Sequence, residues 1–406
     1  MSSPSPAAPS PALSPTVWRL GWVSLLTDVS GDLVTTLLPF FLVGTLGASF
    51  GFVGVIDGAA ESISSLLKIV SGRLADGRVR KKRLVLLGYG IAAFARPLLA
   101  LASAPLHVLL VRVADRLGKG VRSAPRDAWI ADVTPPDQRG RAYGVHRAMD
   151  NAGAFLRPIV GLFLYRGLGL DLQLVFALTI IPGILAVVLA ASAKEPVVPS
   201  APTPSEQPTP VIDAPMPPRL RAFFVVLFVV LFVFTLSTSS DSFILLRGRE
   251  IGIDETLVLE TWIAFAGIRT LLTAPGSALA DRIGRRVSLL AGWALYALVY
   301  VGFSRVASWT TWTVTLFVYA GFYALTEGAE RALVAEMAPA AKRGAAFGWF
   351  HGVTGVAALP ASWAFGALSD HYDMAFAFQI DAGLAVLAAI ALAVIVRTEP
   401  RVTGAR

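Results

Sequence analysis

Long apolar segments without any charged residue recur along the 406-residue chain. Residues 222–234 read AFFVVLFVVLFVF, and residues 382–396 read AGLAVLAAIALAVIV. Charged residues make up only 15% of the chain, against about 25% in a soluble domain. Such a chain cannot cover its surface with side chains that favour water, so we expect a polytopic membrane protein. A soluble enzyme and a disordered scaffold are excluded.

Two Pro-rich stretches divide the apolar part of the chain. Residues 1–17 lack the basic and apolar parts of a signal peptide, so we expect a disordered cytoplasmic tail. Residues 194–220 include nine prolines, which argues against a membrane-crossing helix there because proline has no N–H to donate. We therefore predict two bundles, 18–193 and 221–397, joined by this linker and followed by a short cytoplasmic tail, 398–406.

Each bundle contains six apolar segments of about 20 residues, which is the length needed to cross a bilayer. In the first bundle the segments are 18–43, 51–72, 83–103, 105–126, 141–165 and 171–193. In the second bundle they are 221–246, 256–277, 286–305, 309–331, 343–368 and 374–397. The predicted fold is an all-α membrane protein with 12 transmembrane helices in two six-helix repeats.

Lys and Arg concentrate in the loops that follow every second segment. These loops lie at residues 73–83, 139–141, 282–286 and 342–343, whereas the loop at 44–51 contains neither residue type. By the positive-inside rule, we expect both termini and the linker in the cytoplasm and the protein in the cell (inner) membrane. The net charge of +8 is then a topology signal rather than a nucleic-acid surface.

The two bundles also repeat in sequence. Residues 72–76 (GRLAD) match 277–281 (SALAD) at an offset of 205, and a basic cluster follows each. Residues 130–144 match 334–348 at an offset of 204. A six-helix unit repeated in the same membrane orientation is typical of transporters whose halves rock against each other.

Residues 281–286 read DRIGRR, and together with the repeats they resemble the major facilitator superfamily over nearly the whole chain. The resemblance implies an inward-side latch between helices that forms and breaks during transport. In the first copy Val79 stands where the family has the glycine of a tight turn, so we expect a different shape there. The gate residues are Gly72, Asp76, Arg80, Asp281, Arg282, Gly284, Arg285 and Arg286.

The segment 141–165 resembles a second motif of the family, the antiporter pattern G-x8-G-x3-G-P-x2-G. Its packing residues are Gly144, Gly153, Pro158 and Gly161. In the family this helix contact seals the exterior path, which implies export. Arg157 replaces one glycine of the pattern, and it either fills the helix contact or points into the cavity toward Asp150.

Charged residues inside the apolar segments are candidates for proton coupling and substrate binding, because charge at that depth is costly unless it faces a cavity or a partner. Asp57 and Glu61 are four residues apart, as are two acids of the first segment, so each pair shares a helix face. One member of a close carboxylate pair binds a proton readily. The set is Asp28, Asp32, Asp57, Glu61, Arg96, Arg112, Asp115, Arg116, Asp150, Arg157 and Asp241.

A structural role is the competing explanation for these charges. Each acid can instead pair permanently with a basic residue, and Arg112, Asp115 and Arg116 have the helical spacing of an ion-pair lattice. Arg112 also resembles an arginine that the family links to proton coupling, although Asp115-Arg116 replaces the usual Gln-Gly. Aromatic residues are denser in the second bundle, so we expect coupling charges in the first bundle and apolar substrate contacts in the second.

The leading hypothesis from the sequence is proton-coupled efflux, by antiport, of an amphipathic drug or metabolite through alternating access. The acids would attract a lipophilic cation and the arginines an organic anion, and both substrates stay open. Proton-coupled uptake and a non-transporting sensor are the alternatives. The sequence has no nucleotide loop, metalloprotease motif or serine-hydrolase elbow, so we expect a carrier, not an enzyme, without cofactor or metal. Its expected partners are substrate, protons and lipid, and we expect a monomer.

Overall fold

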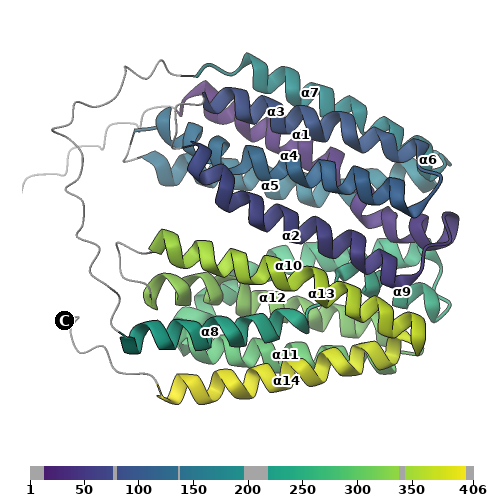
Figure 1. Cartoon of the computed structure of the whole chain (residues 1–406). Helices are drawn as coiled ribbons and strands as arrows, with labels where there is room; N and C mark the ends of the chain where they lie inside the picture. The colour runs from purple at the N-terminus through teal and green to yellow at the C-terminus, as the bar shows by residue number, and fades with distance from the viewer. Residues whose placement is uncertain (1–12, 76–79, 136–137, 196–217, 338–342, 399–406) are drawn as a thin grey trace, which may run out of the picture.

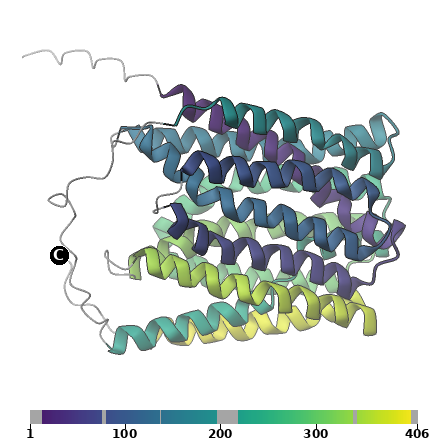
Figure 2. The same cartoon turned by 45° about the horizontal axis from the view of Figure 1, so that its top comes forward.

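The computed structural model describes residues 13–75, 80–135, 138–195, 218–337 and 343–398. These residues form helices joined by short turns, and no strand occurs among them. The helices run side by side in two groups, α1–α7 and α8–α14, which we call the first half and the second half (Figure 1). Figure 2 shows the same two groups from a second side. The predicted all-α membrane architecture is confirmed.

The first half supplies six crossings. The helices α1 and α5 each end in a π-helical turn, and α3 ends in a 3-10 turn. The sixth crossing consists of α6 and α7, which are separated at Thr179. The helices are α1 (Pro15–Phe40), α2 (Phe50–Ala75), α3 (Lys81–Ala95), α4 (Pro105–Asp132), α5 (Arg139–Leu162), α6 (Leu172–Leu178) and α7 (Ile180–Ser192).

The second half also supplies six crossings, with α8 and α9 together forming its first. The helices are α8 (Pro218–Leu236), α9 (Asp241–Glu250), α10 (Glu255–Ile283), α11 (Arg285–Arg305), α12 (Trp309–Met337), α13 (Arg343–His371) and α14 (Met374–Thr398). We call the end of the molecule where α1 begins and α14 ends the Pro15 end. The opposite end, where α2 begins and α13 ends, is the Phe50 end.

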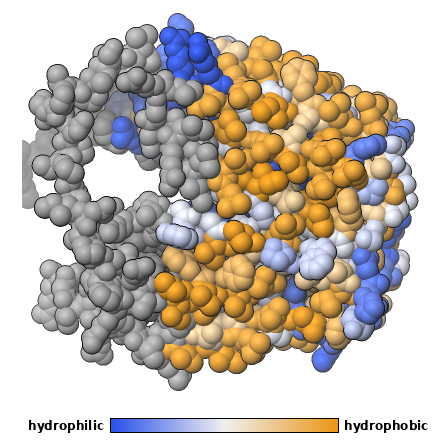
Figure 3. All heavy atoms as spheres, viewed as in Figure 1, coloured by the Kyte–Doolittle hydropathy of each residue, from blue (hydrophilic) through white to orange (hydrophobic). Residues whose placement is uncertain are grey.

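Within the described ranges, nine helical segments are long and apolar enough to cross a membrane by length and composition. The helices α4, α5 and α12 are not among these nine, yet they run alongside the others (Figure 1). In α4 part of the charge lies inside the protein, since Arg112 and Asp115 are buried. Apolar residues cover the middle of the visible face (Figure 3), as expected for a surface in contact with lipid.

The predicted seventh segment, 221–246, is not one continuous helix. Its interruption follows from a run of hydroxyl side chains that bond to the local backbone in place of the helical ladder. The Ser237 hydroxyl donates to the Phe234 carbonyl at 2.6 Å, and the Ser240 hydroxyl accepts from the Ser242 N–H at 3.2 Å and caps a new helix. Asp241 therefore begins α9, whereas the sequence placed it far along a single helix.

The two halves meet most closely along α2 and α13. Glycines permit this approach: a Cβ at Gly54 would lie 2.0 Å from the Ser362 carbonyl oxygen, and a Cβ at Gly58 would lie 2.6 Å from the Leu359 Cα. At the Phe50 end the Asp370 carboxylate accepts hydrogen bonds from the first two N–H groups of α2, at 2.8 and 2.7 Å. The second half thus caps a helix of the first half.

Gly54→Ala tests the close approach of α2 to α13. A methyl group at this position would overlap the Ser362 carbonyl oxygen, which belongs to the backbone and cannot rotate away. We expect the substitution to lower the free energy of unfolding by about 1 to 3 kcal/mol, which is the usual cost of overpacking. Thermal unfolding of the purified protein in detergent measures the effect.

Gly90→Ala is the matched control for that experiment. A Cβ at this position of α3 meets nothing within 4 Å, so the substitution adds no clash. It should be neutral, or stabilise the protein by up to about 1 kcal/mol, because alanine favours the helix over glycine. Equal unfolding temperatures for the two variants would contradict the close contact.

Candidate functional site

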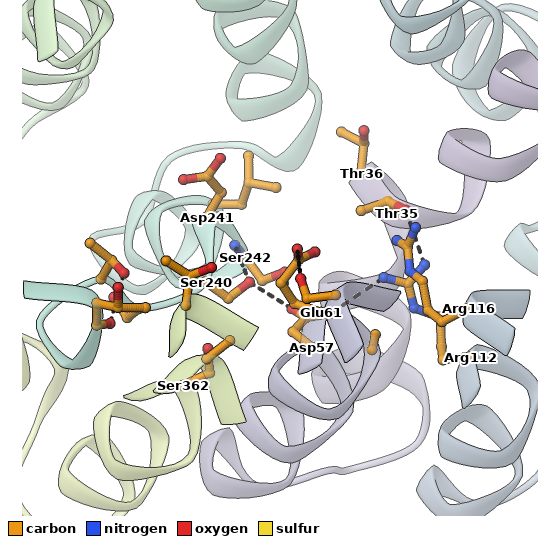
Figure 4. A pocket seen from close by; sticks show the side chains of 18 of the residues that line it. Thr35, Thr36, Asp57, Glu61, Arg112, Arg116, Ser240, Asp241, Ser242 and Ser362 are labelled. Atoms are coloured by element: carbon orange, nitrogen blue, oxygen red, sulfur yellow. Dashed lines mark hydrogen bonds and ion pairs between the residues drawn. The ribbon is translucent and has the colours of Figure 1, made fainter. Parts of the chain in front are cut away.

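A polar chamber with a volume of about 360 Å³ lies between the two halves. The first half contributes α1, α2, α4 and α5 to its wall, and the second half contributes α8, α9, α10 and α13. Figure 4 shows the side chains of these helices converging on the space. Along this part of the interface between the halves, polar side chains replace the apolar ones of ordinary helix packing.

Half of the 20 lining residues are serine or threonine. From the first half they are Thr35, Thr36 and Ser65. From α8, α9 and the turn between them they are Thr235, Thr238, Ser239, Ser240 and Ser242, and α13 adds Thr354 and Ser362. Trp262 is the one aromatic residue among the described residues that line the chamber. The chamber is therefore suited to a ligand with many hydrogen-bonding groups.

Asp57 of α2 connects the two halves inside the chamber. Its Oδ2 accepts hydrogen bonds from the hydroxyls of Ser240 at 2.7 Å and Ser242 at 2.5 Å, both in the second half. Its Oδ1 lies 3.6 Å from Nη2 of Arg112, which is almost fully buried in α4. One carboxylate thus links α2, α4 and the start of α9, as the dashed lines of Figure 4 show.

Opposite charges lie on opposite sides of the chamber. Arg112 and Arg116 extend from α4 on one side, and Asp241 lies across the space at the start of α9 (Figure 4). Arg157 of α5 also lines the chamber. Asp57 and Glu61 lie between these sides on α2. The chamber can therefore pair with both signs of charge at once.

The Asp241 carboxylate is held from behind by tyrosines of α12. Its oxygens accept from the hydroxyls of Tyr319 at 3.2 Å and Tyr323 at 3.3 Å. The guanidinium of Arg269 lies 3.5 Å from the centre of the Tyr323 ring and 3.8 Å from the Glu327 carboxylate. This arrangement fixes the acid at the chamber wall and places a positive charge behind it.

A second cavity of about 460 Å³ adjoins the chamber. The two share Arg157, Asp241 and Trp262 as lining residues. From there the second cavity follows α10 to Ser277, and so extends toward the Pro15 end. The three shared residues stand at the junction between the chamber and this path.

Several of the charged residues predicted from the sequence form ion pairs within the first half instead of lining the chamber. The Arg96 side chain donates to Asp115 at 2.8 Å and to the Thr27 carbonyl at 2.8 Å, and the pair is almost fully buried. Asp150 accepts from the Ser24 hydroxyl at 2.6 Å and lies 3.2 Å from Arg147. These contacts favour a structural role for Arg96, Asp115 and Asp150.

Asp28 of α1 is not among the described residues that line the chamber. Asp28 is close to α5, because a Cβ at Gly153 would lie 3.0 Å from the Asp28 Cβ and 2.7 Å from the Leu25 carbonyl oxygen. The side chain of Asp32 lies outside the described residues. Gly153 therefore brings α5 against α1, as the antiporter pattern implies.

The other residues of that pattern differ in their surroundings. A Cβ at Gly144 would meet nothing within 4 Å, so this glycine makes no close helix contact. Pro158 and Gly161 are buried near the end of α5, which continues into a π-helical turn. Arg157 lines both cavities. This agrees with the predicted orientation into the cavity, although no contact between Arg157 and Asp150 is described.

The DRIGRR motif forms the turn between α10 and α11. Gly284 has a φ of 94°, a left-handed conformation that favours glycine, and Arg285 Nε lies 3.6 Å from Asp281 Oδ1 across the turn. Arg282 and Arg286 flank the same turn. In the first copy Gly72 lies in α2 and Arg80 precedes α3, while Asp76 lies outside the described residues.

Sequence reasoning missed several polar residues of the site. Ser240 and Ser242 bond Asp57, and their signal was visible as six hydroxyl residues within 235–242 of an otherwise apolar segment. Asp381 of α14 is also buried, beside Ser239 and Tyr300. A lone acid in the segment 374–397 was its only signal.

A family model described as Major Facilitator Superfamily matches residues 20–268 and 248–406. The chain belongs to the major facilitator superfamily. An uncharacterized MFS-type transporter of Methanocaldococcus jannaschii is 31% identical over 359 residues, which cover 86% of this chain and 87% of that protein. This facilitator is thus a membrane transporter, and its described helices have the fold of that family.

Two further likenesses of the facilitator are more limited. Multidrug resistance protein MdtH of Proteus mirabilis is 31% identical over 142 residues, which cover 33% of this chain and 35% of that protein. The crystal structure of a bacterial homolog to the human lysosomal transporter Spinster, in an inward-facing and unoccupied conformation, has a TM-score of 0.75 at 16% identity. It covers 96% of this chain and 98% of that chain, and at this identity it shows the fold alone.

Asp115→Asn tests the structural role of the buried ion pair. The substitution leaves the Arg96 guanidinium charged and buried without its counter-ion. We expect a loss of about 3 to 5 kcal/mol in the free energy of unfolding, as is usual when one partner of a buried pair is removed. Thermal unfolding in detergent measures this loss.

Asp127→Asn is the matched control. Asp127 also pairs with an arginine of α4, Arg126 at 2.9 Å, but its side chain is half exposed. An ion pair of that kind contributes about 0 to 1 kcal/mol, so this variant should unfold close to wild type. A stable Asp115→Asn protein that has lost transport would instead assign Asp115 a functional role.

Proposed function

We propose that this facilitator is a proton-coupled antiporter that exports a small polar molecule in exchange for protons. The fold of the family supports alternation of the two halves around a central site, and the polar chamber lies between these halves. The close approach of α5 to α1 at Gly153 and the partial likeness to multidrug resistance protein MdtH support export. The observation that carries the proposal is the bonding of Asp57 across the interface.

The charge of Asp57 determines how firmly the halves are joined at the chamber. As a carboxylate it attracts Arg112 and accepts from both serines, and hydrogen bonds to an ionised acceptor are about twice as strong as neutral ones. Protonation removes the attraction to Arg112 and weakens both serine bonds. Binding of a proton therefore loosens the link between α2 and α9.

Asp57 and Asp241 line the same chamber, and Asp57 bonds Ser240 and Ser242, the residues on either side of Asp241, so two ionised carboxylates there would repel each other. A proton on either acid relieves that repulsion, and so does a cationic group placed between them. Arg112 and Arg116 face this pair from α4, and Arg157 faces it from α5. Arg269 of α10 lines the adjoining cavity together with Asp241, Glu61 lies one turn from Asp57 on α2, and the lining residues of α13 are uncharged. Proton and substrate thus compete for the same acids, as antiport requires.

The loop charges support an orientation with the Pro15 end in the cytoplasm. In this orientation the second cavity leads from the chamber toward the cytoplasm, and the α2–α13 contact closes the exterior side. The chamber lining favours a polar metabolite over the amphipathic drug considered from sequence. The aromatic residues expected to bind such a drug largely pack on one another within the second half, as Tyr296 does on Tyr300.

Asp57→Asn tests the coupling role. The amide keeps the size of the side chain but carries no charge and cannot be protonated in the same way. In liposomes containing a pH-sensitive dye, panels of zwitterions, organic anions, sugars and lipophilic cations are added under an imposed proton gradient. We expect wild type to exchange protons for one class, and the variant to lose this flux by about tenfold or more.

Asp171→Asn is the control, because Asp171 caps α6 at the Phe50 end through its bond to the Leu174 N–H. Asparagine caps helices equally well, so flux should match wild type. Unchanged flux in Asp57→Asn would refute coupling through this residue. Movement of solute and protons in the same direction would replace export by symport.

A further inference from the structure

We infer that the transported molecule is a small hydroxylated zwitterion. Its ammonium group lies beside Asp241, and its carboxylate lies beside Arg116 and Arg157. This inference rests on the proposed transport function and names the substrate class for the same chamber. It follows from the placement of charge, the hydroxyl lining and the volume of the space.

The placement of charge favours a ligand of both signs. Asp241 and Arg116 stand on opposite sides of the chamber (Figure 4). A purely anionic ligand that binds the arginines must also approach Asp57, Glu61 and Asp241. A purely cationic ligand that binds these acids must approach the three arginines. A zwitterion spanning the chamber pairs with both sides, and each of its charges meets an opposite one.

The acidic side is arranged to receive an ammonium group. The tyrosine hydroxyls hold the Asp241 carboxylate in place, and Arg269 lies over the Tyr323 ring on the side of the second cavity, which Asp241 also lines. Asp57 adds a second carboxylate to the same wall, since it bonds Ser240 and Ser242 on either side of Asp241. An ammonium group between the two acids would therefore relieve their repulsion as a proton does, which connects the substrate to the coupling step.

The basic side is arranged to receive a carboxylate. Arg112 lies 3.6 Å from Asp57 and donates to the Thr35 hydroxyl at 3.2 Å. Arg116 lines the same wall one helical turn further along α4, and Arg157 stands at the junction with the second cavity. Guanidinium groups match the planar geometry of a carboxylate. A substrate arriving through the second cavity meets Arg157 and Asp241 together where the two spaces join.

The hydroxyl lining selects against lipophilic ligands. Ten serine and threonine residues line the chamber, and Trp262 is the one aromatic among its described lining residues. Most of these hydroxyls donate to the protein itself, as Thr238 does to the Thr235 carbonyl at 2.8 Å and Ser65 to Glu61 at 3.2 Å, but their oxygens can still accept hydrogen bonds. An apolar ligand would remove water from these oxygens without replacing its hydrogen bonds, which costs free energy. A ligand with hydroxyls of its own replaces them.

The volume limits the size of the substrate. Ligand pockets commonly measure roughly 300 to 1,000 Å³, and this chamber, at about 360 Å³, lies near the lower limit. A ligand between an amino acid and a dipeptide in size fits such a space. The chamber alone, without the adjoining cavity, therefore suits a substrate of this size.

Equilibrium binding to the purified protein, without any gradient, tests the inference. The probes are L-threonine and the dipeptide seryl-serine, each with its methyl ester, which lacks the anion, and its N-acetyl derivative, which lacks the cation. L-valine matches threonine in shape without the hydroxyl, and tetraphenylphosphonium represents lipophilic cations. Tryptophan fluorescence and ligand-induced thermal stabilisation report binding. We expect at least one parent zwitterion to bind about tenfold or more tightly than both of its derivatives.

Two variants assign each charge to its side of the chamber. Asp241→Asn should weaken binding of the parent zwitterion about tenfold while leaving the N-acetyl derivative unchanged, since that derivative has no ammonium group to lose. Arg116→Gln should weaken the parent by a similar factor and leave the methyl ester unchanged. Arg139→Gln, an exposed change at the Pro15 end of α5, is the control. Unfolding temperatures without ligand confirm that each variant is folded.

Each outcome separates this inference from the transport proposal. Esters or N-acetyl derivatives that bind as well as the parents overturn the zwitterion, as does tighter binding of tetraphenylphosphonium. A folded protein that binds no probe of the panel overturns it as well. Zwitterion binding without proton flux in liposomes supports the substrate class and refutes the antiporter. Proton flux driven by lipophilic cations supports the antiporter and refutes the zwitterion as its substrate.

Discussion

The carboxylate of Asp57 is the contact on which the arrangement of the two halves depends. It accepts from Ser240 and Ser242 of the second half while attracting Arg112 of the first. These bonds require α9 to begin next to α2, and α9 begins there because the hydroxyl run after Leu236 interrupts the seventh crossing. The approach of α2 also requires the glycines that face α13. A local break and a set of small residues thus position one charged group.

The interiors of the two halves are stabilised by different interactions. In the first half, buried ion pairs such as Arg96–Asp115 connect its helices. In the second half, aromatic rings fill the interior: Phe234 stacks on Trp293 with ring centres 3.9 Å apart, and Tyr296 on Tyr300 at 4.1 Å. Aromatic packing is insensitive to protonation, whereas charged networks respond to it. The halves should therefore differ in how they respond to a proton.

The fold was predictable from sequence because the signals for it are strong and local. Uncharged segments of crossing length, the proline-rich linker and the repeat at an offset of 204 to 205 predict two six-helix units, and the fold class is confirmed. The break between α8 and α9 was not predicted, because the apolar residues before it dominate the average hydropathy of the segment. The break arises because single hydroxyl side chains bond backbone carbonyls, and an average over about 20 residues does not detect an effect of single residues.

The chamber itself was only partly predictable. Periodicity placed Asp57 and Glu61 on one face, and both line the chamber. It could not show that Arg96 pairs with Asp115 nearby, since that contact depends on how α3 packs on α4. Partner choice among buried charges is decided by distances of a few ångströms between helices. The sequence pattern carries no information on such distances.

The bonds from Asp370 to the start of α2 carry a further consequence for the balance between conformations. A helix-capping interaction is worth about 1 kcal/mol, and opening the Phe50 end breaks this one. On that scale the cap alone lowers the population of the state open at the Phe50 end by about fivefold. The resting ensemble of the empty carrier is thereby biased toward the conformation closed at that end, before any substrate or proton binds.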